Sequence, residues 1–179
     1  MWLKVLLGIL ACLSVSQAQK GLSLEERVHN LQESLFRRPV MRLNGDKFRN
    51  YVRTSPRNYS TIVMLTALSG HRGCQICRHA YDEYEIVANS FRYAFLQQKS
   101  LYFAMVDFDE GQDVFQLLSL NTAPVVIHFP PKGQRKRADT MDFQRVGFGA
   151  EAIAKFVQDR TDIAVSCSIA LVHMESLIC

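Results

Sequence analysis

The sequence has 179 residues, of which 48% are hydrophobic, and its 21 basic and 17 acidic side chains give a formal net charge of +4 at pH 7. This length suits one domain with a single hydrophobic core. The positive excess is small, and no basic stripe interleaved with aromatic residues runs along the chain, so the sequence predicts no nucleic-acid partner.

The chain begins with the layout of a secretory signal peptide over residues 1–18. Lys4 precedes an apolar run from Val5 to Val15, and Ala18 provides a small residue at the expected cleavage site. The run is shorter than the roughly 20 residues of a membrane-spanning helix, although a signal anchor is the alternative. We therefore expect a lumenal or secreted domain over residues 19–163, followed by a divergent tail over 164–179.

Cleavage after Ala18 would remove Cys12. The other four of the five cysteines are Cys74, Cys77, Cys167 and Cys179. Secretory routing permits disulfides, but four thiols are too few to form the framework of a domain of this size. The fold must therefore depend on its hydrophobic core.

The first part of the predicted domain alternates between amphipathic and apolar segments. Leucine and valine at helical spacing predict a helix from Leu22 to Phe36. A short strand from Val40 to Leu43 stops at the turn signal Asn44-Gly45, and Asp46 is the expected N-cap of the next helix. Residues Thr61 to Leu68 are apolar almost without alternation, which predicts a strand buried on both faces.

The second part continues the alternation. After the loop SGHRG a helical pattern extends to about Gln98, and residues Leu101 to Phe108 form a second apolar strand. A short helix in DVFQLLSL, a strand from Val125 to Phe129 and an antiparallel strand from Thr140 to Val146 precede a closing helix in AEAIAKFVQDR. This order predicts an α/β fold with a central mixed sheet flanked by helices, in which the last two strands form a hairpin.

The most informative motif is the pair Cys74 and Cys77, between the end of a buried strand and the first turn of a helix. The free N–H groups and the dipole of a helix start stabilise an anion, which predicts a thiol pKa for Cys74 below the value of about 8.5 for free cysteine. Cys77 follows one turn later, on the same side of the helix and within bridging reach. A redox pair is favoured over a structural disulfide or two reduced core thiols. Zinc is disfavoured because it needs four ligands, and only His71 and His79 lie nearby.

Three further polar patterns have simpler interpretations. Asn58-Tyr59-Ser60 is a glycosylation sequon in a loop before a strand, so Asn58 is a candidate glycosylation site. A basic turn is expected to be solvated, with contact to anionic lipid or a partner subunit as the alternative. A run of acidic residues misses the spacing of an EF-hand loop and is expected to cap the short helix. The basic residues are Lys132, Arg135, Lys136 and Arg137, and the acidic ones are Asp107, Asp109, Glu110 and Asp113.

A CxxC motif on the helix after a central strand, with an Ala123-Pro124 step before a later strand, resembles the thioredoxin fold. In that fold such a proline is cis and faces the active site, and proline is the residue for which a cis peptide bond costs little. By this resemblance the backbone at Ala123 pairs with an extended substrate peptide. Ala123 and Pro124 are therefore the expected substrate-binding residues.

The resemblance extends to a specific family. The sequence is similar to the lumenal thioredoxin-like domain of the oxidoreductase subunits of the oligosaccharyltransferase complex in the phrases RPVMRLNGDKFR, PRNYSTIVMLTAL, CQICRHAYDEYEIVANSFRY, FAMVDFDEGQDVFQLLSLNTAP, HFPPKGQRKRADT and FVQDRTDI. In animals this family comprises the tumour suppressor candidate and magnesium transporter proteins. The similar region extends from Leu22 to about Ile163.

The resemblance implies a lumenal role in the endoplasmic reticulum that assists protein N-glycosylation. Cys74 would form a mixed disulfide with a cysteine of a nascent glycoprotein, and Cys77 would resolve it, while another subunit transfers the glycan. The implied partners are the other subunits of the complex and cysteine-containing nascent polypeptides, with no cofactor and no metal. The alternatives are a noncatalytic peptide-binding or assembly module and, for full-length family members, magnesium transport.

The sequence also departs from these relatives. Family members continue into four membrane helices, which the tail after Ile163 is too short to supply, so we expect the chain to represent the lumenal domain and to conduct no magnesium. Gly73 replaces the tryptophan that usually precedes the motif in thioredoxin, and Gln75-Ile76 replaces the common glycine-proline. The strand Thr61 to Leu68 contains no acid to take a proton from Cys77. We therefore expect a slow, substrate-holding thiol pair instead of a general reductase.

Overall fold

The computed structural model describes residues 21–94 and 100–164. The predicted signal peptide lies outside the described residues, as do the expected helix end near Gln98, residues 165–179 of the tail, and Cys12, Cys167 and Cys179. The described strands are β1 (Val40–Arg42), β2 (Ser60–Thr66), β3 (Leu101–Asp107) and β4 (Val125–Phe129). The helices are α2 (Leu24–Arg37), α3 (Gly45–Phe48), α4 (Gln75–Ala94), α5 (Gln112–Leu117), α6 (Phe143–Val146) and α7 (Ala150–Thr161), with short helical turns η1 (Arg49–Arg53), η2 (Gly70–Arg72) and η3 (Arg137–Asp139).

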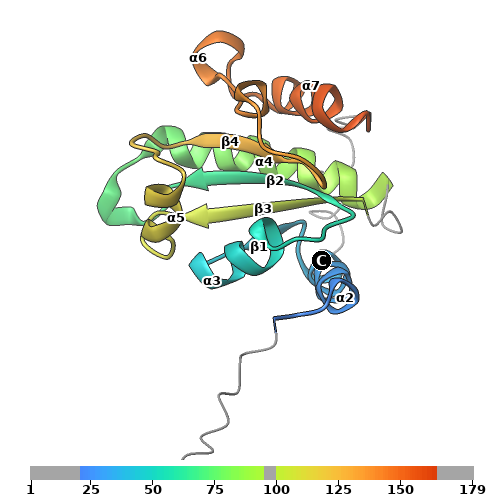
Figure 1. Ribbon diagram of the computed structural model, residues 1–179. Helices are drawn as coiled ribbons and strands as arrows, with labels where there is room; N and C mark the ends of the chain where they lie inside the picture. The colour runs from blue at the N-terminus through green and yellow to red at the C-terminus, as the bar shows by residue number, and fades with distance from the viewer. Residues whose placement is uncertain (1–20, 95–99, 165–179) are drawn as a thin grey trace, which may run out of the picture.

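The four strands form one mixed sheet in the order β1-β3-β2-β4 (Figure 1). β1 and β2 both pair with β3 in parallel, whereas β4 pairs with β2 antiparallel. In this register Leu65 lies opposite Val125, and Thr61 lies opposite Phe129. The start of β4 therefore lies beside the end of β2. The structure confirms the predicted α/β class and the central position of the two longest apolar strands.

Helices cover both faces of the sheet, with α4 and α7 over one face and α3 and α5 over the other (Figure 1). Side chains of β2 point to the two faces in turn: Ile62 and Met64 belong to the cluster under α4 and α7, and Val63 and Leu65 belong to the opposite cluster. This two-sided burial explains why the strand reads as an uninterrupted apolar run. β2 lies between β3 and β4, and the loop that leads to Cys74 begins at its end.

Helix α2 forms a smaller third cluster at the side of the domain. Its N-terminus carries a capping box in which Ser23 and Glu26 bond each other's backbone N–H groups, which explains a start slightly later than the predicted Leu22. Leu31 packs with two buried tyrosines, Tyr59 and Tyr102, whose rings meet edge to face. The helix is thus held to the sheet by apolar contacts.

Two predictions about the local structure are wrong. The expected antiparallel strand Thr140 to Val146 is reduced to a single bridge between Thr140 and Ile127, and α6 occupies most of its length. The reason is Asp142, whose side chain accepts a hydrogen bond from the Arg145 backbone N–H and so begins a helical turn. Similarly, Asn44 caps α3 by accepting from the Lys47 N–H, and the predicted cap Asp46 lies within the helix. In both places the position of a capping side chain decides where the helix begins.

Within the described residues, no helix combines the length and the apolar character that crossing a bilayer requires.

Candidate active site

The connection from β2 to α4 positions the first cysteine. After β2 ends at Thr66, the chain passes through η2 and reaches Gly73, whose φ of +62° is a left-handed conformation that favours glycine. Cys74 then directly precedes α4, and the Arg78 backbone N–H donates to the Cys74 carbonyl. Cys74 therefore occupies the N-terminal boundary of the helix, where backbone N–H groups remain free of intrahelical partners.

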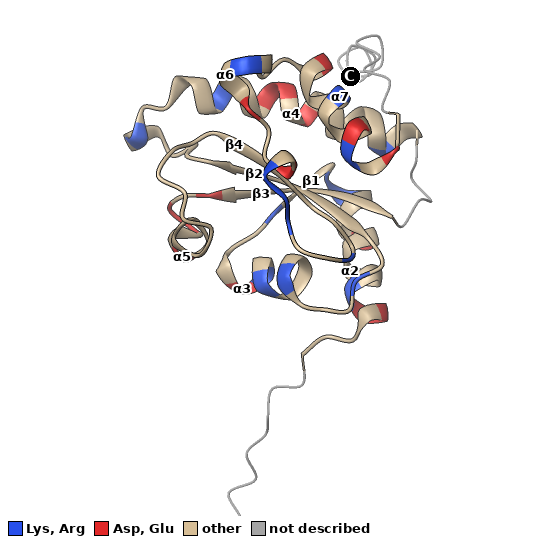
Figure 2. Cartoon of the chain, turned by 45° about the horizontal axis from the view of Figure 1, so that its top comes forward, with Lys and Arg blue, Asp and Glu red and all other residues tan. Residues whose placement is uncertain are grey.

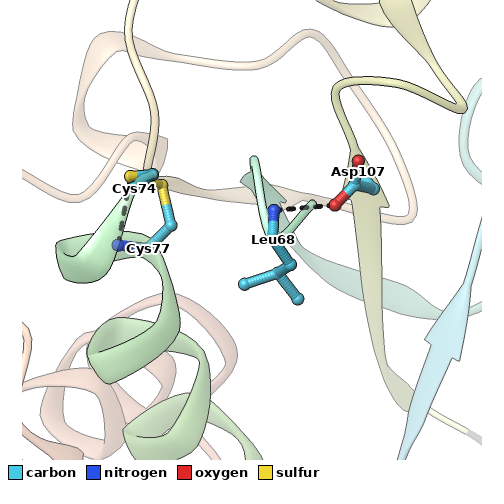
Figure 3. The surroundings of a disulfide bond; sticks show 4 residues. All are labelled: Leu68, Cys74, Cys77 and Asp107. Carbon is cyan, nitrogen blue, oxygen red and sulfur yellow. Dashed lines mark hydrogen bonds between the residues drawn. A yellow bond between two sulfur atoms is a disulfide. The ribbon is translucent and has the colours of Figure 1, made fainter. Parts of the chain in front are cut away.

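In the structure Cys74 and Cys77 are joined by a disulfide, with 5.3 Å between their Cα atoms. Cys77 is fully buried, whereas Cys74 is partly exposed. The Cys77 backbone N–H donates to the Cys74 sulfur across 3.3 Å (Figure 3). Of the two cysteines, the more exposed one, Cys74, is also the one at the start of the helix dipole. A thiolate formed at this position would be stabilised by the same N–H group and dipole.

Asp107, at the end of β3, anchors the loop that leads to the disulfide. Asp107 is 1% exposed, and its carboxylate accepts from the Leu68 N–H at 2.8 Å (Figure 3). The same carboxylate accepts from the Asp109 N–H at 3.0 Å. Sequence reasoning assigned Asp107 to helix capping and missed this role. The signal in the sequence was that Asp107 is the one acid within the apolar strand Leu101 to Phe108. Because a buried carboxylate without hydrogen-bond donors is costly, such a residue is expected to accept hydrogen bonds.

Asp109 holds the turn η2 from the other side. Arg72 forms an ion pair with Asp109, and His71 Nε2 lies 3.3 Å from the second carboxylate oxygen. The hydrogen bond from Arg72 is the main reason that the pKa of Asp109 lies below its usual value. The Arg72 guanidinium also lies over the Phe108 ring, 4.6 Å from its centre. The loop before Cys74 is therefore tied to the end of β3 at two points.

The predicted capping role of the acidic run is wrong for its other members as well. The N-cap residue of α5 is Gly111, which makes no side-chain capping bond, while Glu110 pairs with Arg42 and Asp113 pairs with Arg49. Over residues 21–94 and 100–164, no cluster of three His, Cys, Asp or Glu side chains is arranged to hold a metal ion.

The structure brings Pro124 to the same edge of the sheet as the cysteines. The Ala123–Pro124 peptide bond is cis, and the next residue, Val125, pairs with Leu65 near the end of β2. A cavity of about 340 Å³ adjoins Cys74, and its described lining residues do not include Ala123 or Pro124. They are Leu68, Ser69, Gly70, Gly73, Cys74, Gln75, Arg78 and His79. The sheet topology thus brings the two cysteines and the Ala123–Pro124 step to the same edge of the sheet. The cavity beside Cys74 is lined by the β2–α4 loop and the start of α4.

The predicted sequon lies at the opposite end of β2. Asn58 is exposed, but Ser60 is buried, and its hydroxyl lies 3.1 Å from His128 Nε2. His128 Nδ1 in turn lies 3.2 Å from a buried Asp139 carboxylate. In the folded domain the asparagine of the sequon is thus exposed, and the serine hydroxyl is enclosed between β2 and β4.

Comparison with known proteins places this geometry in context. A model of the OST3/OST6 family, described as a transporter family, matches residues 26–177. The glycosyltransferase subunit MAGT1 of Xenopus laevis is 48% identical over 161 residues, covering 90% of this chain and 49% of that protein. The human MAGT1 subunit is 52% identical over 150 residues, covering 84% and 45% respectively. The chain spans about half the length of these relatives.

Solved structures resemble the fold at low sequence identity. Human ERp44 (form II) superposes with a TM-score of 0.54 at 16% identity, covering 68% of this chain and 30% of that one. Thioredoxin from Trypanosoma brucei brucei superposes with a TM-score of 0.50 at 18% identity, covering 69% and 92%. The fold is therefore thioredoxin-like, as predicted.

Proposed function

The chain belongs to the OST3/OST6 family, and from this premise we propose that it forms the thiol-disulfide oxidoreductase domain of an oligosaccharyltransferase subunit on the lumenal side of the endoplasmic reticulum. The related subunits are named as parts of a dolichyl-diphosphooligosaccharide–protein glycosyltransferase. The partners of this chain would be other subunits of that complex and cysteine-containing nascent polypeptides. Its contribution to N-glycosylation would be to hold the polypeptide, while another subunit transfers the glycan.

The observation that carries this proposal is the unequal exposure of two bonded cysteines at a helix start. In the oxidised state a substrate thiolate would attack the accessible Cys74 sulfur, the Cys74–Cys77 bond would break, and Cys77 would leave as a thiolate. Attack by the Cys77 thiolate on Cys74 would reverse this step and release the substrate thiolate. In the reduced state the Cys74 thiolate would instead attack a substrate disulfide, and one substrate cysteine would leave as a thiolate.

The surroundings of Cys77 support a slow thiol pair that holds its substrate. β2 contains no acid, and the nearest buried acid on β3, Asp107, already accepts bonds from two backbone N–H groups. Neither central strand therefore offers a free carboxylate to take a proton from the Cys77 thiol. Resolution would be slow and the mixed disulfide long-lived.

The cavity beside Cys74 supports recognition of an extended polypeptide. Its volume of about 340 Å³ suits a peptide side chain, and its wall includes the polar side chains of Ser69, Gln75, Arg78 and His79. The cis Ala123–Pro124 step at the same sheet edge would offer backbone groups to the peptide. Together these features would hold a substrate cysteine near the exposed sulfur.

A trapping experiment tests the proposal. A Cys77→Ser chain, reduced and mixed with a peptide that contains an activated disulfide, should accumulate a mixed disulfide at Cys74 because no resolving thiol remains. Mass spectrometry after thiol blocking would identify the bonded residue, and the matched Cys74→Ser chain should accumulate much less because Cys77 is buried.

Equal and low trapping by the two variants would contradict a catalytic pair. The domain would then be a noncatalytic peptide-binding or assembly module, and a Cys74→Ser protein would retain full function in a glycosylation complementation assay.

A further inference from the structure

A basic cavity of about 630 Å³ lies at the end of the sheet opposite the disulfide. It is bounded by η1 and the segment after it, by the end of α5, and by the loop after β4. Because Phe129 pairs with Thr61 at the start of β2, this loop is separated from the cysteines by the length of the central strand. The cavity is therefore distinct from the candidate active site.

The charge of the cavity wall is of one sign. Its lining residues include four basic side chains and no acidic one: Arg53, Arg57, Lys132 and Arg135. Among the described residues none of these four forms an ion pair, whereas Arg49, in the same turn η1 as Arg53, is paired with Asp113. Four unneutralised cations around one cavity attract an anion of more than one charge.

Arg57 adds a buried hydrogen-bond donor that lacks an acceptor. Its Nη2 donates to the Pro130 carbonyl at 2.7 Å, while its Nη1 is buried and has no hydrogen-bond partner in the described part of the chain. Burial first, and then the charges of Arg27 and Arg53, lower the pKa of Arg57. Leaving a buried charged donor unpaired is unfavourable, and an anion in the cavity would supply the missing acceptor.

The fold assembles these residues from two distant segments. Arg53 and Arg57 precede β2, and Lys132 and Arg135 follow β4, so the antiparallel pairing of the two strands brings them together. Figure 2 shows basic positions both on the helical turns beside α3 and on the chain between β4 and α6. Gly133, with a φ of +80°, turns the second segment around the cavity.

We propose that this cavity binds a phosphate-bearing ligand, which Arg57 contacts from within and Arg53, Lys132 and Arg135 neutralise at the rim. Guanidinium groups match phosphate oxygens in bidentate geometry, and several cations without an acid favour a phosphate or diphosphate group over a single carboxylate. The site is independent of the disulfide chemistry.

Titration of the purified chain with inorganic pyrophosphate at low ionic strength, followed by calorimetry, tests the proposal. We expect saturable one-to-one binding that weakens about tenfold in Arg57→Gln and in Arg53→Gln, because each removes a charge-assisted contact. Arg38→Gln, which removes an exposed arginine outside the cavity, should bind like the unmodified chain. Arg53 is exposed, so its variant reports on binding even where Arg57→Gln disturbs folding. The Cys74→Ser,Cys77→Ser chain should also bind normally.

Vesicles distinguish a free phosphate from a phosphate borne by lipid. Co-sedimentation with phosphatidic acid vesicles but not with phosphatidylcholine vesicles, abolished by pyrophosphate and by Arg53→Gln, would assign a lipid-borne ligand, and pyrophosphate binding without co-sedimentation would assign a free one. The proposal is overturned if pyrophosphate does not bind saturably, if Arg38→Gln weakens binding as much as the cavity variants do, or if a polyglutamate peptide binds more tightly than pyrophosphate.

Discussion

Cys74 and Cys77 differ in exposure because they lie at different points of one helical turn. Cys74 is at the boundary of α4, where the chain arrives from a surface loop, and Cys77 is on the helix face that packs against the sheet. The residue types are identical, and only their positions on the helix assign the attacking and resolving roles that we propose. The sequence predicted the pair at the first turn of the helix, and the structure adds the difference in burial between the two side chains.

Buried His128 predicts a pH-dependent stability. Burial lowers its pKa and outweighs the opposing effect of Asp139, while Arg160 and Arg57 lower it further. The folded state therefore resists protonation, and the unfolded state gains a proton as pH falls below about 6.5. From this group alone, the free energy of unfolding should fall by at most about 1.4 kcal/mol between pH 7.5 and pH 5.5.

Urea denaturation at the two pH values measures this effect. His128→Gln should be less stable at pH 7.5, because it loses the contact with Asp139, but its stability should change less between the two pH values. His29→Gln, which alters an exposed histidine, should keep the pH dependence of the unmodified chain. An unchanged pH dependence in His128→Gln would show that His128 is protonated equally in both states.

At the scale of elements, the strands and long helices followed from the sequence, but their connections did not. β2 and β3 are buried on both faces, so their apolar runs were unambiguous. The loop between β2 and α4 is held by Asp107 at the end of β3 and by Asp109 in the turn after it, about 40 positions later in the sequence. A pattern read along the chain contains no information on such pairings, and for this reason the acidic run was wrongly assigned to helix capping.

Loosening this loop should reduce stability. Asp107→Asn replaces one of two carboxylate oxygens by an amide that donates, so one of the Leu68 and Asp109 N–H groups loses its acceptor in a buried position. Thermal or urea unfolding should show a loss of about 1–3 kcal/mol.

Asp113→Asn is the matched control for this change. Its carboxylate forms an exposed ion pair with Arg49, and removal of such a pair should cost no more than about 1 kcal/mol. Equal losses in the two variants would show that Asp107 does not anchor the loop more strongly than a surface ion pair does.

At the scale of the whole molecule, the fold class and the family were predictable, and the comparisons confirm both. The CxxC motif and the Ala123-Pro124 step are local signals, and the topology of a mixed sheet brings them to one edge. The basic cavity was not predictable as a site. Only the pairing of β2 with β4 joins Arg53 and Arg57 to a turn that the sequence alone presents as solvated.

The central claim is that the start of α4 keeps the sulfur of Cys74 ionised and open to a substrate. The pH dependence of alkylation by iodoacetamide tests it most directly, measured at Cys74 in the reduced Cys77→Ser chain by site-resolved mass spectrometry. We predict a midpoint below the value of about 8.5 for free cysteine, and a rate well above that of Cys77 in the Cys74→Ser chain. A midpoint at or above that value, or equal rates at the two positions, would contradict the account.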